Sequence, residues 1–292
     1  MWKTRTIKTE PSFNFQLTVQ SHGWYDLPPF RFDKAKGTLE YTFVEGGKVV
    51  NASVRHSKEG LNIELDHAAS EKSMIPQKVR HIFRLDDDLE EFYREFCGKD
   101  GFEWVRKRGA GRLLRSPTAF EDLVKTMCTT NCSWGLTRKM VANLVDLLGM
   151  KSNAGNATFP TAEAMAAVDE KFYRDEIRAG YRSPYFVELA AAVASKKLDP
   201  ESWTHSQLPT TDLKKQIKSV KGIGDYAAEN MLKLLGRYDG LALDSWLRAQ
   251  FYKKHNAGRK CSDKKIDKQY SKFGDWKGLA IWCDMTAEWH AE

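Results

Sequence analysis

The chain has 292 residues, 41% hydrophobic and 29% charged, which is typical of a globular protein with a substantial core. Its five cysteines form no paired pattern, no secretion signal precedes them and no apolar run is long enough to cross a membrane, so we expect a reduced, intracellular setting. The net charge of +7 is uneven, with nine basic and three acidic residues between 253 and 277, and a basic face suits a polyanion.

Short runs that alternate apolar and polar residues dominate positions 1–88. They lie at 13–19, 39–44, 48–54 and 61–65, and a Gly46-Gly47 pair separates the second run from the third. A period of two bounded by turn residues predicts antiparallel strands joined by hairpins.

The period changes after Leu85. Three aspartates at 86–88 precede Leu89, Phe92, Tyr93 and Phe96, which are spaced as on one face of a helix. Acidic residues suit the first turn of a helix because they complement its dipole. We therefore predict an α+β protein, with a β-rich N-terminal domain at 1–88 and an all-α domain at 89–292.

Helices are predicted through the middle of the chain. Ser116 is expected to cap the first, with Pro117 at its first position, and this helix should break at the polar run 129–133. Ser133 is expected to cap a second helix that Gly149 ends. Further short helices are expected at 162–168, 188–196 and 212–220.

The segment from Leu213 to Phe251 carries the strongest functional signal. It predicts a helix, a tight hairpin at 221–224, a second helix from Asp225, a glycine-containing loop and a third helix opened by Asp244. Gly222 and Gly224 allow a sharp turn and a close approach of the backbone to a ligand. Backbone amides at the start of the second helix suit a phosphate. Asp244 by itself could be an ordinary helix cap.

This arrangement resembles the helix-hairpin-helix DNA glycosylases. The resemblance implies that Lys221, Gly222, Ile223 and Gly224 bind a DNA phosphate, that the hairpin carbonyls hold a monovalent cation, and that Asp244 drives cleavage of an N-glycosidic bond. The chain departs from the family pattern in the loop at 236–240, which has glycines but no proline.

Two further stretches resemble the branch that holds 8-oxoguanine glycosylases and 3-methyladenine glycosylase II. In the polar break at 129–133, the resemblance implies that Asn131 fills space beside the orphaned base. In the turn at 180–182, it implies that Tyr181 wedges into the base stack and that Arg182 contacts the unpaired partner base. A flat ring can fill the gap that an extruded nucleotide leaves. The alternatives are a helix-to-helix turn and a loop with a buried tyrosine.

The resemblance also implies a base pocket formed by Tyr226, Asn230 and Trp282, or Cys283 in place of Trp282. Tyr226 stands where bifunctional relatives carry their nucleophilic lysine, and a phenol cannot form an imine. We therefore predict a monofunctional glycosylase of base excision repair that leaves an intact abasic site. An aromatic pocket favours cationic, alkylated purines, with 8-oxoguanine next; uracil or another modified pyrimidine stays open.

We expect no cofactor, because only Cys261 and Cys283 lie where some relatives carry a four-cysteine iron–sulfur cluster. The expected partner is double-stranded DNA containing a damaged base. We expect a monomer, with no membrane association, that is cytoplasmic (in the nucleoid) or nuclear. The alternatives are a bifunctional 8-oxoguanine glycosylase/lyase and a non-catalytic helix-hairpin-helix DNA-binding module, which would have no use for the carboxylate of Asp244.

Overall fold

The computed structural model describes residues 3–66, 69–96, 99 and 101–290. Five antiparallel strands form one sheet in the order β1-β5-β4-β3-β2. They are β1 (Lys3–Ile7), β2 (Arg31–Asp33), β3 (Thr38–Glu45), β4 (Lys48–Ser57) and β5 (Gly60–Leu65). The strands predicted at 39–44, 48–54 and 61–65 are confirmed. Gly46 and Gly47 both adopt positive φ at the β3–β4 turn, as a tight hairpin requires.

The strand predicted at 13–19 is wrong, because this run forms a short helix, α1 (Phe15–Val19). Asn14 caps it by accepting a hydrogen bond from the Leu17 amide at 3.0 Å. Phe15, Thr18 and Val19 are buried at helical spacing, and Leu17 is buried in a different cluster of side chains. Gln16 is exposed, and a run of so few residues is too short for its period to distinguish a helix from a strand, so tertiary packing decided the outcome.

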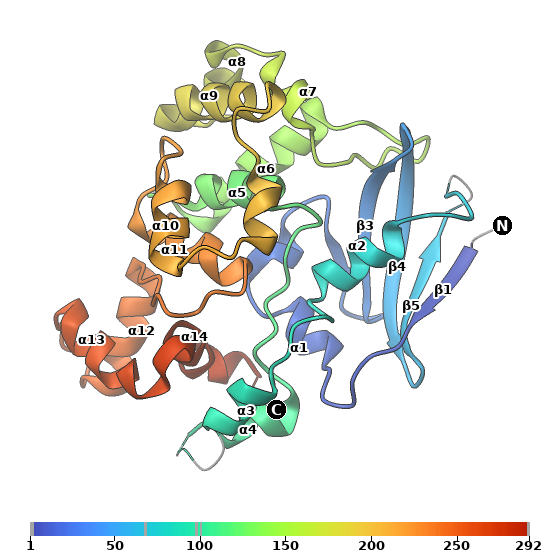
Figure 1. The fold of residues 1–292 in the computed structure, drawn as a ribbon. Helices are drawn as coiled ribbons and strands as arrows, with labels where there is room; N and C mark the ends of the chain where they lie inside the picture. The colour runs from blue at the N-terminus through green and yellow to red at the C-terminus, as the bar shows by residue number, and fades with distance from the viewer. Residues whose placement is uncertain (1–2, 67–68, 97–98, 100, 291–292) are drawn as a thin grey trace.

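Helices make up most of the remaining chain, and the α+β class is confirmed (Figure 1). The α-helices are α2 (Ile75–Ile82), α3 (Glu90–Phe96), α4 (Glu103–Arg108), α5 (Ala119–Thr129), α6 (Trp134–Leu148), α7 (Ala162–Ala166), α8 (Glu170–Asp175), α9 (Ser183–Ala194), α10 (Thr210–Lys218), α11 (Asp225–Leu234), α12 (Ser245–His255), α13 (Asp263–Tyr270) and α14 (Lys277–Thr286). Short 3-10 turns are η1 (Gly23–Asp26), η2 (Gly180–Arg182), η3 (Pro200–His205), η4 (Ser271–Trp276) and η5 (Ala287–His290).

The helix caps agree only in part with the prediction. Ser133 caps α6, as expected, and its hydroxyl accepts from the Leu136 amide. Ser116 does not cap α5: Thr118 does, through the Glu121 amide. The Ser116 amide instead donates to the buried carboxylate of Asp122 at 2.9 Å. Ser116 thus precedes α5 and is held in place by a side chain of that helix.

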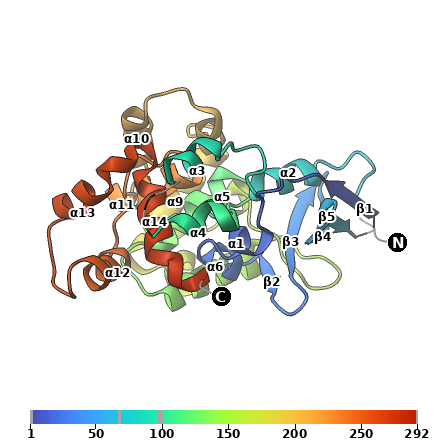
Figure 2. The same cartoon turned by 90° about the horizontal axis from the view of Figure 1, so that it is seen from below.

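The sheet lies on one side of the molecule and the helices fill the other, with α7–α9 at one end of the helical part and α12–α14 at the other (Figures 1 and 2). One buried apolar cluster runs from the sheet through α5, α6, α9 and α11, and a second joins α3 and α4 to α12–α14. Because the first cluster is continuous across residue 88, the domain boundary placed there stays a prediction.

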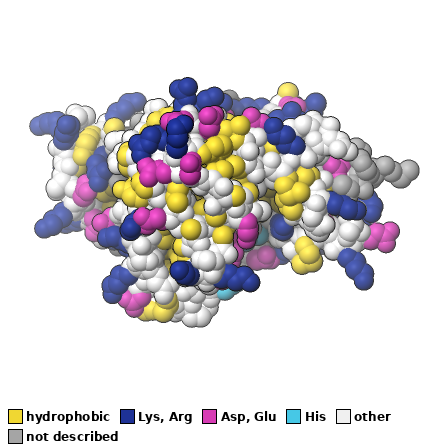
Figure 3. Space-filling model, turned by 90° about the horizontal axis from the view of Figure 1, so that it is seen from above, with side chains coloured by type: hydrophobic (Ala, Val, Ile, Leu, Met, Phe, Trp, Pro, Cys, Tyr) yellow, Lys and Arg dark blue, Asp and Glu magenta, His cyan; other side chains and the backbone are white. Residues whose placement is uncertain are grey.

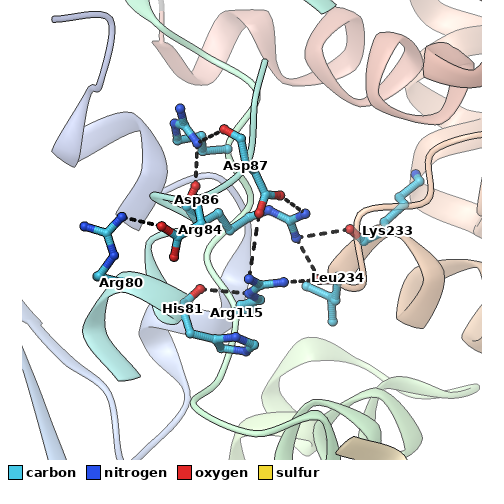
Figure 4. Close-up of polar contacts among 9 residues, drawn as sticks. Arg80, His81, Arg84, Asp86, Asp87, Arg115, Lys233 and Leu234 are labelled. Atoms are coloured by element: carbon cyan, nitrogen blue, oxygen red, sulfur yellow. Dashed lines mark hydrogen bonds and ion pairs between the residues drawn. The ribbon is translucent and has the colours of Figure 1, made fainter. Parts of the chain in front are cut away.

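A buried cluster of arginines joins the end of α2 to the end of α11 (Figure 4). Arg84 donates to the carbonyl of Leu234 at 2.7 Å and forms an ion pair with Asp87, and Arg115 donates to the same carbonyl at 3.4 Å. Burial opposes ionisation of Asp87, but the two guanidinium groups hold its pKa below the usual value. These cations satisfy the orphan carbonyls at the C-terminus of α11 and so fix the position of that helix.

Candidate active site

The hairpin between α10 and α11 is tight because glycine is required within it. Gly222 has a φ of +87°, and a Cβ there would lie 2.5 Å from a ring carbon of Tyr185. Gly224 is the N-cap of α11 and has no side chain to satisfy the first amides of the helix. The backbone of the loop thus packs directly on an aromatic ring and leaves its outer side open.

Several amides of this hairpin are free to bind an anion. In the described part of the chain, the Gly222 and Gly224 amides make no hydrogen bond, whereas the Ile223 amide donates to Val220 and Ile223 itself is buried. The exposed Lys221 forms an ion pair with Glu188 at 2.8 Å. Free amides at a helix N-terminus beside lysines can hold a phosphate group.

Asp244 opens α12, as predicted, and its two oxygens have different surroundings. Oδ1 accepts a hydrogen bond from the Leu247 amide at 2.6 Å, which is the cap. Oδ2 lies 3.4 Å from the hydroxyl of Tyr226, and the side chain is half-buried. The cap therefore orients the carboxylate and leaves the second oxygen available to a ligand.

A cavity of about 620 Å³ opens beside this carboxylate. Residues of both apolar clusters line it, and its walls come from η1, α5, α6, α11, α12, α14 and η5. Its polar lining includes Gln20, His22, Thr126, Thr129, Asn230, Lys233 and Asp244, and its aromatic lining includes Trp24, Tyr25, Trp134, Tyr226, Trp246, Trp282 and Trp289. An apolar cavity of this size with a few convergent polar groups is typical of a small-molecule site.

The structure brings together the three residues that the sequence analysis assigned to a base pocket. Tyr226, Asn230 and Trp282 all line the cavity, and the indole of Trp282 is oriented by a hydrogen bond to the Ser21 carbonyl at 2.9 Å. Cys283, the alternative to Trp282, is buried and does not line the cavity.

Sequence reasoning missed Lys233, Trp246, His22 and Trp24. Lys233 follows Tyr226 by seven residues on the same face of α11, and Trp246 follows Asp244 by two. Their spacing from predicted site residues could therefore have identified both from the sequence. No such signal pointed to His22 and Trp24, which come from the far end of the chain. Burial lowers the pKa of His22 to about 4, so its ring is neutral and adds no charge to the cavity.

The residues predicted to fill the DNA stack also meet in space. Asn131 has a left-handed backbone, with φ of 45°, and its amide nitrogen lies 3.3 Å from the Tyr181 hydroxyl. Tyr181 is 49% exposed. The break after α5 and the turn η2 therefore form one exposed polar and aromatic projection.

Arg182 differs from its two neighbours in this projection. It is only 3% exposed, and its guanidinium donates to the carbonyl and hydroxyl oxygens of Thr130 and packs over the Tyr181 ring. Without DNA it braces the break against η2. Contact with a partner base would require these hydrogen bonds to open.

Charges are mixed on the face at the α7–α9 end of the molecule, where basic and acidic side chains alternate around apolar ones (Figure 3). No helix of the described residues is long and apolar enough to cross a membrane. Across the same residues, no group of three or more His, Cys, Asp or Glu side chains is placed to hold a metal ion. Cys97 lies outside the described residues.

Known proteins resemble this one in sequence or in structure across nearly the whole chain. A probable N-glycosylase/DNA lyase from Methanothermobacter thermautotrophicus is 22% identical over 302 residues, or 92% of each chain. The 3-methyladenine DNA glycosylase structure from Archaeoglobus fulgidus has a TM-score of 0.77 at 21% identity, covering 98% of this chain and 99% of that one. No family model matches the chain.

A third likeness is to the 8-oxoguanine glycosylase/lyase of Clostridium acetobutylicum, solved with double-stranded DNA containing cytosine opposite 8-oxoguanine. Its TM-score is 0.75 at 18% identity, with 99% of this chain and 98% of that one covered. These likenesses confirm the resemblance to helix-hairpin-helix DNA glycosylases. At these identities they show the fold, and the chemistry has to be argued from the site.

Proposed function

We propose that this protein is a DNA N-glycosylase that binds duplex DNA, turns a damaged base into the aromatic cavity and hydrolyses its N-glycosidic bond. The observation that carries the proposal is the carboxylate of Asp244, which lines this cavity beside a hairpin with unpaired amides. Its Oδ1 is used by the helix cap, whereas Oδ2 accepts one long hydrogen bond, from Tyr226 at 3.4 Å. A carboxylate next to a phosphate-binding surface repels DNA, so a module that only bound DNA would gain nothing from it.

The hairpin and the projection act on the DNA backbone and stack. The amides of Gly222 and Gly224, with Lys221, hold a phosphate near the damaged nucleotide. Tyr181 and Asn131 fill the gap that the extruded base leaves in the duplex. Arg182 can join them once it leaves Thr130.

Asp244 stabilises the positive charge that develops on the deoxyribose as the bond breaks. The electron pair of the C1′–N bond leaves on the base, and a water oxygen bonds to C1′. The proton that this water releases neutralises the departing base, and the product is an intact abasic site.

Tyr226 supports a monofunctional reaction. Burial, followed by the neighbouring Asp244 charge, raises the pKa of its phenol, so the hydroxyl stays neutral and donates toward the carboxylate. A neutral phenol does not form a covalent bond with the sugar, and water is the nucleophile.

The test compares the wild type with Asp244→Asn on duplexes that each carry one defined lesion, with and without alkali after the reaction. We expect strand breaks only after alkali, and a loss of excision in the variant of about 10²- to 10³-fold or more. Both proteins should bind DNA. Equal excision by the two, or tight binding with no excision of any lesion, would contradict the proposal.

The bifunctional alternative has one observation in its favour, a buried amine on Lys233 in the same cavity as Asp244. Borohydride reduction during the reaction distinguishes the two. A protein–DNA cross-link that is lost in Lys233→Met would establish a lyase, and we expect no cross-link.

A further inference from the structure

Lys233 is buried in the wall of the cavity and only partly satisfied. The residue is 3% exposed, and its ammonium donates to the carbonyl of Leu241 at 2.9 Å. An ammonium carries three N–H donors. This is its one hydrogen bond within the described part of the chain, which leaves donors for whatever occupies the cavity.

Lys233 lies near the C-terminal end of α11, close to the end of the row of helix residues that line the cavity. Tyr226, Asn230 and Lys233 follow one another along one face of the helix, and all three line the cavity. At a rise of 1.5 Å per residue, Lys233 lies about 10 Å along the helix from Tyr226, the residue that contacts Asp244. Asp244 and Lys233 line the same cavity, so a nucleotide whose sugar lies at Asp244 has room to place its base beside Lys233.

No carboxylate of the described residues forms an ion pair with this ammonium, because the neighbouring Glu229 is taken up by Lys214 and by the Ala242 amide. Burial lowers the pKa of Lys233 to about 8, although Glu229 and Asp244 oppose the shift. The group is therefore still largely protonated at neutral pH, and it gains from any acceptor that enters the cavity.

We propose that Lys233 determines the lesion specificity of this site by donating to a carbonyl oxygen of the flipped base. The accepted substrates are then neutral oxidised or deaminated bases, in preference to cationic alkylated purines. This inference rests on the proposed glycosylase function and names the substrate class of the same site.

The hydrogen bond also assists departure of the base. As the C1′–N bond breaks, negative charge grows on the base and reaches its carbonyl oxygen, where a desolvated ammonium stabilises it. A base without a carbonyl at this place leaves the ammonium buried without a new partner, which the site penalises.

A cationic purine meets a different environment. The ammonium of Lys233 already lies 5.8 Å from the ring centre of Trp282, so the aromatic face that would attract a cationic base is shared with a fixed cation. Like charges in a desolvated cavity repel. Lys233 thus reverses the preference for alkylated purines that the aromatic residues alone suggested.

The test measures kcat/KM for wild type and Lys233→Met on four duplexes. Two carry neutral bases with a carbonyl, 8-oxoguanine and hypoxanthine. One carries 1,N6-ethenoadenine, which is neutral and has no carbonyl. The last carries 7-methylguanine, which has a carbonyl but is a cation and so tests the effect of charge. We expect the wild type to favour the first two. In the variant, their kcat/KM relative to ethenoadenine should fall about 10- to 100-fold, as expected for loss of a charged hydrogen bond, and the ratio of 7-methylguanine to 8-oxoguanine should rise.

Lys277→Met is the matched control, because it removes the same charge from α14 at a residue that does not line this cavity. It should leave all four ratios unchanged. Binding of the same duplexes to Asp244→Asn and to Asp244→Asn/Lys233→Met, measured by fluorescence anisotropy, gives a readout without catalysis. The first protein should prefer the two neutral lesions that have a carbonyl, and the second should lose that preference.

Three results would overturn the proposal. One is a wild type that prefers 7-methylguanine, and another is a Lys233→Met variant that loses all four activities equally while melting at or above the wild-type temperature. Both leave the glycosylase function standing. The third is absence of excision of any lesion together with no selective binding, which overturns the proposed function and this inference together.

Discussion

Lys125 and Lys233 are both buried, yet their surroundings differ in the feature that separates a structural charge from a functional one. Lys125, on α5 beneath the sheet, is 0% exposed and lies 2.6 Å from the Glu121 carboxylate and 3.3 Å from the Ser116 hydroxyl. Tyr41 of β3 donates to the same carboxylate at 2.5 Å. Every partner of Lys125 belongs to the packed interior.

Lys233 faces a cavity, and its one hydrogen bond is to a backbone carbonyl in the described structure. The comparison teaches that burial alone does not identify a functional charge. A buried cation that is paired holds two parts of the fold together. A buried cation with spare donors and a cavity in front of it costs stability, and that cost is understandable if a ligand completes the site.

The largest expected change in stability is that caused by Lys125→Met. Removing the ammonium leaves Glu121 buried without a cation, and this should lower the free energy of unfolding by about 3–5 kcal/mol. Urea denaturation monitored by circular dichroism measures it. A loss below about 1 kcal/mol would show that the two lysines do not differ as described.

Lys233→Met should have the opposite sign and raise the free energy of unfolding by about 1–3 kcal/mol at pH 7. The pKa of Lys233 is about 8 in the folded protein and 10.5 in the unfolded chain. Between pH 8 and pH 10.5 the unfolded chain therefore keeps a proton on this lysine that the folded protein has lost. The wild type therefore carries the full cost below pH 8 and recovers stability as pH rises toward 10.5.

The difference between wild type and Lys233→Met isolates this group from the other groups that titrate in alkali. At pH 7 the variant is expected to have the larger free energy of unfolding. This difference should shrink by about 3 kcal/mol at most between pH 7 and pH 10.5, because folding lowers the pKa of Lys233 from 10.5 to about 8. Denaturation at both pH values checks it. An advantage that grows with pH would contradict the assignment.

Replacing both members of the Lys125 pair sharpens the comparison further. Glu121→Gln/Lys125→Met removes both charges, and it should recover about 1–3 kcal/mol of the loss seen in Lys125→Met. A double-mutant cycle by urea denaturation gives the coupling. Strict additivity would mean that the ion pair contributes nothing specific.

The smallest effect is expected at an exposed lysine. Lys221→Ala removes a surface ion pair with Glu188 and should change stability by less than about 0.5 kcal/mol. If Lys221 contacts a DNA phosphate, its loss should weaken binding a few-fold and reduce the slope of log affinity against log salt by about 1. An unchanged salt slope would remove Lys221 from the DNA interface.

Local sequence determined the elements that depend on neighbours in the chain. The hairpin at 221–224, the cap at Asp244 and the strand pairs beyond residue 38 follow from glycine conformations, capping and alternation over a few residues. The strand predicted at 13–19 was wrong because alternation over so few residues fits a short helix as well as a strand, and the packing of this run against the rest of the fold decided between them.

The tertiary structure alone decided which side chains share the cavity and which charges are paired. Lys125 and Lys233 look alike in the sequence, each an isolated lysine in an apolar helix. Glu121 lies one turn from Lys125 and neutralises it. The acid one turn from Lys233 is Glu229, and it is bound instead to Lys214 and the Ala242 amide. The chain fixes the helix that carries each lysine; the packing of distant elements fixes what each ammonium meets, because electrostatic energy depends on distance and burial rather than on order along the chain.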